Sequence, residues 1–195
     1  SLMASHDRLA QVMGQIKILA SALFKISNDI KILSSGPRSG IYELIIPQNE
    51  PGSSIMPGKV NPTQCEALSM VCTQVMGFEY AVSIANASGT LQMNEYKPLI
   101  GFNILTSIKL LNNAISNFRL KLVEGIQPNP KTIKKNLENS LMLVTALVPK
   151  IGYEKAAEIA NLAFNESINL KEATIKLGYL TANDFEDAIN TNKMI

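Results

Sequence analysis

Apolar residues recur at steps of three, four and seven along residues 5–33, which is the period of a helix rather than of a strand. The apolar positions are Leu9, Val12, Met13, Ile16, Ala20, Leu23, Phe24 and Ile30. The segment SSGPRSG follows at residues 34–40, and its Gly and Pro residues predict the end of the helix. We therefore expect one long helix over residues 5–33.

A second long helix is predicted over residues 62–87. Asn61 is a residue type favoured at the N-cap, Pro62 fits the first helical position, and Gln64 stands three residues after the cap. Most of its circumference is apolar, which indicates a helix with neighbours on several sides. The apolar positions are Ala67, Leu68, Val71, Cys72, Val75, Met76, Ala81, Val82, Ile84 and Ala85.

A third long helix is expected from about residue 96 to residue 122. Three helices of this length exceed the average of about eleven or twelve residues in globular proteins. A lone trio would shield its apolar surface poorly, so we expect an oligomer or a larger bundle. The residues that support this helix are Leu99, Phe102, Leu105, Ile108, Leu111 and Ile115.

After the segment GIQPNP at residues 125–130, the pattern changes to short helices. These are predicted over residues 131–136, 140–147, 153–167, 170–177 and 181–189. Gly178 should end one of them, and Thr181 with Asp184 should cap the next. The weak strand pattern YELIIP lies at residues 42–47. We expect an all-α protein, with a long-helix bundle at residues 1–124 that contains the loop 52–61, and a small helical C-terminal domain at residues 125–195.

Composition restricts the class of partner. The chain has 195 residues, of which 46% are hydrophobic and 17% charged, and its net charge is +2. These values are typical of a well-packed globular protein without a basic footprint for nucleic acid. The sequence contains no cluster of Cys and His residues that would suggest a metal site. It also contains no long uncharged apolar run that would suggest a membrane segment. We expect neither nucleic acid nor membrane as a partner.

The two cysteines, Cys65 and Cys72, are too far apart along one helix to form a disulfide, at roughly 10 Å. Unpaired cysteines with apolar neighbours are typical of small buried side chains in a reducing compartment. The start of the sequence lacks the pattern of a signal peptide. We therefore expect an intracellular protein, in a bacterial cytoplasm or a mitochondrial matrix.

The loop GSSIMPGKVN at residues 52–61 superficially resembles a phosphate-binding P-loop. That motif requires four residues between its glycines and a Ser or Thr after its lysine. Here five residues separate Gly52 from Gly58, and Val60 follows Lys59. The start of the following helix, with Lys59 beside it, instead predicts a binding site for a carboxylate or phosphate. Ser53 and Ser54 lie upstream in the same loop, where their hydroxyl groups could face the anion.

Two further residues can be interpreted in two ways. Glu66 lies one turn into the second helix, where it either complements the helix dipole or orients a histidine. The single histidine of the chain, His6, lies near the start of the first helix and is interpreted as solvated or structural.

The segments GSSIMPGKVNP and TQCEAL at residues 52–68 strongly resemble the signature of the fumarase/aspartase superfamily, specifically the iron-independent class II fumarases. The resemblance extends over nearly the whole chain. Further matching segments are ASHD (4–7), NDIKILSSGPRSG (28–40), IPQNEPGSS (46–54), ENSLMLVTAL (138–147), IGYEKAAEIA (151–160) and LKEATIKLGYL (170–180).

The resemblance implies reversible hydration of fumarate to (S)-malate, a step of the tricarboxylic acid cycle, without metal or organic cofactor. Ser53 matches the catalytic serine, thought to be the base when the loop closes, and Glu66 matches the residue that holds the catalytic histidine. The substrate-contacting positions are matched by Ser54, Lys59, Val60 and Asn61. The family's assembly is a homotetramer whose sites draw segments from three subunits.

The family's catalytic histidine and its other substrate loops have no counterpart in these residues, and His6 does not match the histidine. We therefore expect a C-terminal part of a fumarase that is inactive alone. Two alternatives stay open, an enzyme like aspartate ammonia-lyase, which shares the loop, and a non-catalytic helical assembly domain. The NPTQCEAL segment favours the hydratase.

Overall fold

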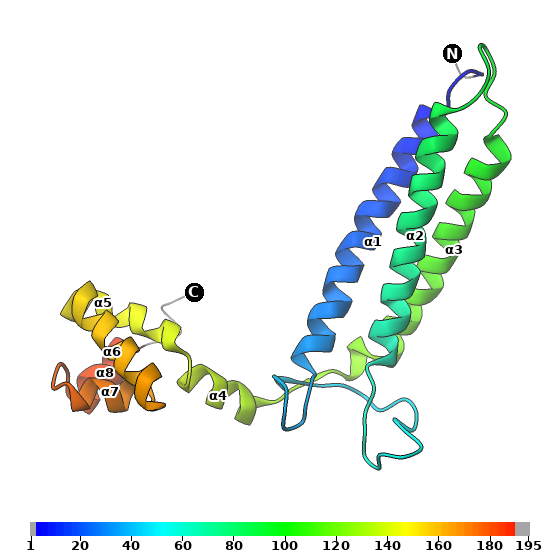
Figure 1. The fold of residues 1–195 in the computed structure, drawn as a ribbon. Coiled ribbons are helices and arrows are strands. Elements are labelled where there is room, and N and C mark those ends of the chain that lie inside the picture. The colour runs from blue at the N-terminus through cyan, green and yellow to red at the C-terminus, as the bar shows by residue number, and fades with distance from the viewer. Residues whose placement is uncertain (1–2, 190–195) are drawn as a thin grey trace. The chain divides into compact units, whose positions relative to one another are not determined.

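The computed structural model describes residues 3–189 and divides the chain into two compact units, with the boundary in the sequence between Asn129 and Pro130. Three long helices lie side by side in the first unit, as Figure 1 shows. They are α1 (Asp7–Leu33), α2 (Thr63–Ala87) and α3 (Lys97–Lys121). The predicted all-α class and the three long helices are confirmed, and α2 packs against both of its neighbours.

The core of this unit is apolar and is centred on α2. Fully buried side chains come from all three helices, for example Met13 of α1, Leu68 and Val75 of α2 and Ile100 of α3. Deleting one such side chain to Ala typically costs about 2–5 kcal/mol, so this packing holds the helices firmly. An ion pair between Lys17 Nζ and Glu79 Oε2, 2.9 Å apart, also joins α1 to α2.

By length and composition alone, α1 and α2 are each apolar enough to cross a membrane, with a mean hydropathy of 1.3. A core helix of a larger bundle meets the same test. The charged pair Lys17 and Glu79 lies within these two helices and joins them, which fits a bundle. The absence of a membrane partner stays a prediction.

A short antiparallel ribbon lies at the end of the bundle where α1 and α3 end. In it, β1 (Leu44–Ile45) pairs with β2 (Gln127–Pro128), which follows the short 3-10 helix η1 (Val123–Gly125). The Asn129 N–H also donates to the Glu43 carbonyl, at 2.8 Å. The weak strand signal at residues 42–47 thus marks a real strand of two residues. Because β2 pairs back onto the first unit, the division follows Asn129, whereas the sequence placed it after residue 124.

The second unit consists of short helices: α4 (Pro130–Glu138), η2 (Leu141–Leu147), α5 (Val148–Ile151), α6 (Tyr153–Glu166), α7 (Leu170–Lys176) and α8 (Ala182–Ala188). Residues 141–147 form a 3-10 helix rather than the simple helix expected, and α5 was not predicted as a separate element. The buried core consists of Leu147, Ile159, Ala163, Leu170, Ala173 and Phe185.

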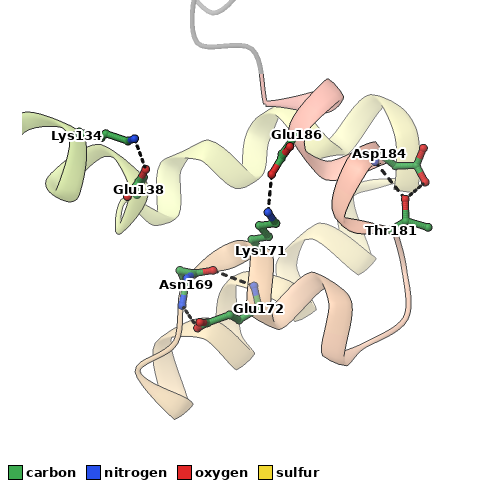
Figure 2. A network of polar contacts seen from close by, with 8 residues as sticks. All are labelled: Lys134, Glu138, Asn169, Lys171, Glu172, Thr181, Asp184 and Glu186. Carbon is green, nitrogen blue, oxygen red and sulfur yellow. Dashed lines mark hydrogen bonds and ion pairs between the residues drawn. The ribbon is translucent and has the colours of Figure 1, made fainter.

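Polar side chains cap the starts of α7 and α8 in the second unit, as Figure 2 shows. The predicted cap is confirmed, because Thr181 Oγ1 accepts the Asp184 N–H at 3.2 Å. A reciprocal capping box, not anticipated, starts α7: Asn169 Oδ1 accepts the Glu172 N–H at 2.9 Å, and Glu172 Oε2 accepts the Asn169 N–H at 3.2 Å. Gly178, at a φ of +68°, follows the end of α7 as predicted.

Candidate functional site

The loop at residues 52–61 leaves and returns through a narrow neck just before α2. A Cβ atom at Gly52 would lie 1.7 Å from the Lys59 carbonyl oxygen, which excludes any larger residue without opening the neck. The side-chain amide of Asn61 donates a hydrogen bond to the Gly52 carbonyl across the same neck. The two ends of the loop are therefore held against each other by backbone contact and by one side chain.

The predicted N-cap of α2 was wrong. The helix begins at Thr63, Pro62 occupies the N-cap position, and no side chain caps the first turn. Asn61 lies one position before this N-cap, and its side-chain NH2 group donates to Gly52 in the neck. The first turn of the helix nevertheless presents N–H groups that lack intrahelical partners, so the positive end of its dipole faces the end of the loop.

Ser53 is half-buried at the start of the loop, and its hydroxyl oxygen organises the backbone that follows. Ser53 Oγ accepts the N–H groups of Ile55 at 3.2 Å and of Met56 at 3.3 Å. Two N–H donors on one oxygen stabilise negative charge on that oxygen. Ser54 beside it is exposed, as are the side chains of Ile55 and Met56.

A pocket of about 510 Å³ lies beside the loop, between the end of α1 and the segments around β1 and the start of α2. Lys59 and Val60 line one part of it, and Lys31, from the last turn of α1, lines another. Ser53, Ser54 and Asn61 are not among its lining residues. The structure thus gathers two lysines at one pocket, while the serines lie on a different part of the loop.

Glu66 lies in the first turn of α2, as the sequence indicated, and faces the end of α1. Its Oε1 atom is 3.4 Å from Lys31 Nζ, and both side chains are about half exposed. Sequence reasoning missed Lys31, although it falls within the segment NDIKILSSGPRSG, which carried the family resemblance. A lysine in the last turn of a helix is ordinarily explained by the helix dipole, so its spacing alone gave no functional signal.

The cysteines are buried and free, which confirms their interpretation as small core side chains. Burial raises the pKa of the Cys65 thiol to about 11, and the nearby positive charge of Lys31 opposes that rise. Burial likewise raises the pKa of Cys72. Both thiols are therefore protonated near neutral pH and poor nucleophiles.

His6 is structural, and it lies at the opposite end of α1 from Lys31. Its ring Nε2 is 3.2 Å from the Asn94 carbonyl oxygen, and its backbone N–H donates to Asn86 Oδ1 at 2.8 Å. Asn86 in turn donates to Asp7 Oδ1, which holds the pKa of Asp7 below its usual range. A helix of 27 residues is about 40 Å long, so His6 cannot reach Glu66. Among residues 3–189, no group of three His, Cys, Asp or Glu side chains could hold a metal ion.

Two family models match this sequence, one described as "Lyase" over residues 1–77 and one described as "Fumarase C C-terminus" over residues 143–195. Over all 195 residues, the chain is 98% identical to "Fumarate hydratase class II" of Prochlorococcus marinus subsp. pastoris and covers 42% of that protein. It is 56% identical to the protein of the same name from Listeria monocytogenes serotype 4b over 98% of this chain, again 42% of the relative. The chain thus spans about two fifths of the length of these curated relatives.

Solved structures give the same result. The recombinant class II fumarase from Schistosoma mansoni matches with a TM-score of 0.92 and 44% identity, over 96% of this chain and 39% of that one. A 3-carboxy-cis,cis-muconate lactonizing enzyme from Pseudomonas putida matches with a TM-score of 0.75 and 19% identity, over 96% of this chain and 44% of that one. The second match shows a shared fold alone.

Proposed function

Because this chain belongs to the class II fumarate hydratase family, we propose that the protein containing it interconverts (S)-malate with fumarate and water. In the direction of elimination, a base removes a proton from the carbon beside one carboxylate, and the resulting dianion is stabilised by fixed donors. Hydroxide then leaves, takes a proton from a general acid and departs as water. Such a reaction belongs in the tricarboxylic acid cycle.

The contacts of Ser53 carry this proposal. A serine is a weak base unless its alkoxide is stabilised, and the N–H groups of Ile55 and Met56 both point at Ser53 Oγ. We assign Ser53 as the base on this ground together with its family match. The narrow neck at Gly52 and Asn61 supports the assignment, because it fixes the position of the loop relative to α2.

The last residues of this loop offer a suitable partner for the substrate carboxylate. Lys59 and Val60 line the 510 Å³ pocket, and the dipole of α2 favours negative charge at its start. Together with Ser54 and Asn61, they are assigned to substrate binding by their family match. Glu66 is assigned to orient the catalytic histidine, which must come from another part of the protein since His6 lies at the far end of α1.

Activity of the full-length protein tests the proposal. Conversion of malate to fumarate, followed by the ultraviolet absorbance of fumarate, should fall at least about 100-fold in Ser53→Ala, as expected when a catalytic base is lost. The 195-residue chain alone should show no turnover above background, because it lacks the histidine. Turnover of aspartate with release of ammonia would favour the ammonia-lyase, and inactivity of the full-length protein towards both substrates would favour the assembly domain.

Self-association forms part of the proposal. Apolar side chains of α1 remain exposed at heptad spacing, at Val12, Leu19 and Ile26, and those of α3 include Phe102 and Leu105, which are 63% and 69% exposed. Such exposed apolar surfaces on long packed helices are typical of helix bundles built from several copies. We propose that copies of the full-length protein cover them in a homotetramer. Sedimentation should show a tetramer, and the double variant Phe102→Glu and Leu105→Glu should shift it to smaller species.

A further inference from the structure

Lys31 joins the end of α1 to the start of α2 through the carboxylate of Glu66. Its Nζ atom lies 3.4 Å from Glu66 Oε1. Both residues stand in the terminal turns of helices that pack against each other along their length, so the backbone positions of the pair are fixed by the core. Lys31 also lines the pocket that Lys59 and Val60 line.

The positive charge of Lys31 acts electrostatically on Cys65 in the first turn of α2. The pKa of the Cys65 thiol is raised by burial, and the positive charge of Lys31 acts against that rise. Of the described residues, the other titratable side chains that line the pocket are Tyr42 and Lys59. The titratable lining of the pocket is thus cationic or neutral, and its Lys31 is the residue that pairs with the carboxylate of Glu66.

We propose that Lys31 is a positioning residue that holds Glu66 for catalysis, an inference that rests on the role of Glu66 in the proposed hydratase. A lysine on Oε1 leaves Oε2 to accept the ring N–H of a histidine, and it restricts the rotation of the carboxylate. Its positive charge also offsets part of the negative charge of the carboxylate. The offset limits how far Glu66 raises the pKa of the histidine.

The test compares Lys31→Met, Lys31→Arg and Lys17→Met in the full-length enzyme. Lys17 is a matched control, because it also joins α1 to α2 through a glutamate, Glu79, at 2.9 Å, but lies within the helices rather than beside the loop. We expect kcat of Lys31→Met to fall about tenfold with KM changed less than about twofold, and Lys31→Arg to recover most of the loss. Lys17→Met should leave kcat unchanged even where it lowers the melting temperature.

The pH profile of kcat/KM gives a readout that a purely structural role would not move. Without Lys31, the limb that reports the histidine should shift to higher pH by about half a unit or more, since the carboxylate then acts at its full charge. In a Glu66→Gln background, Lys31→Met should have no further effect on kcat, because the two residues act through one contact.

The outcomes separate the two proposals. An inactive wild-type enzyme would contradict the proposed function itself. An active wild type in which Lys31→Met matches Lys17→Met in both kcat and pH profile would overturn the role of Lys31. If Lys31→Met does not fold, as judged by circular dichroism, Lys31→Gln takes its place in the same comparison, with the same expected results.

Discussion

The side-chain amide of Asn61 donates to the carbonyl of Gly52, and this single hydrogen bond joins the two ends of the loop that carries Ser53. The two residues lie nine positions apart in the sequence. Asn61 makes this bond through its NH2 group, whereas a helix cap would use its Oδ1 atom, and no side chain caps the start of α2. A residue whose type suggests a helix cap is here used to fix the base of a loop.

Gly52→Ala should damage the site while leaving the core intact. Its new Cβ would meet the Lys59 carbonyl oxygen at 1.7 Å, a backbone atom that moves only if the neck opens. In the full-length protein, we expect malate turnover to fall at least about 100-fold, since small displacements of catalytic groups have effects of this size. The melting temperature of the 195-residue chain should change by less than about 3 °C, because the loop lies outside the core.

Gly14→Ala is the matched control for this substitution. Gly14 lies within α1, and no atom outside its own helix backbone lies within 4 Å of a Cβ added there. Alanine should therefore stabilise the isolated chain by about 0.5–1 kcal/mol, because it restricts the unfolded chain. Full activity of Gly52→Ala in the same assays would contradict the steric role of the neck.

Asn169→Ala should destabilise the second unit. The substitution removes the acceptor of the Glu172 N–H and breaks the reciprocal capping box at the start of α7. Loss of an N-cap side chain typically costs about 1 kcal/mol. Hydrogen exchange on the 195-residue chain should show faster exchange of the amides of α7, with those of α1–α3 unchanged. Glu138→Ala breaks only the exposed ion pair with Lys134. This variant should show the same amide exchange rates as the wild type in α7 and in α1–α3.

Helices were predictable because their signals are local. The apolar period gave the three long helices to within a few residues, and the Thr181 cap and the Gly178 end followed from residue type alone. The pairing of β1 with β2 was not predictable, since it joins Leu44 to Pro128 across most of the first unit. The division of the chain therefore follows Asn129, near the end of the turn segment 125–130, whereas the sequence placed it at the start of that segment.

In the candidate site, too, local features were predictable from the sequence and long-range contacts were not. Ser53, Lys59 and Glu66 were predicted as site residues because they stand in one continuous segment that resembles a known family. Lys31 was missed because only the packing of α1 against α2 brings it to Glu66. The use of Asn61 in the neck was likewise hidden, because residue type cannot show which of two backbone partners a side chain selects.

Ser107→Ala should stabilise the first unit. Ser107 is fully buried in α3, and its hydroxyl oxygen has no hydrogen-bond partner. A buried polar group without a partner costs about 1–3 kcal/mol, so its removal should raise the free energy of unfolding by about 1 kcal/mol. The matched substitution is Ser27→Ala in α1, where the equally buried hydroxyl donates to the Phe24 carbonyl at 2.9 Å. Chemical denaturation should show a gain for Ser107→Ala and none for Ser27→Ala; the reverse order would show that the Ser107 hydroxyl is satisfied in solution.

Glu79→Gln should weaken the dependence of stability on pH. Hydrogen bonds from Lys17 and Ser83 lower the pKa of the Glu79 carboxyl in the folded state. The stabilisation is therefore present above the pKa of an unfolded glutamate, about 4.3, and is lost as the pH falls through the lower folded value. Urea denaturation of the 195-residue chain should give a lower midpoint for Glu79→Gln than for wild type at pH 7, and midpoints that converge towards pH 3. Glu138→Gln, in an exposed pair 3.8 Å from Lys134, should follow the wild type at both values. Equal differences between wild type and Glu79→Gln at pH 7 and pH 3 would show that the substitution acts through packing rather than through the charge of Glu79.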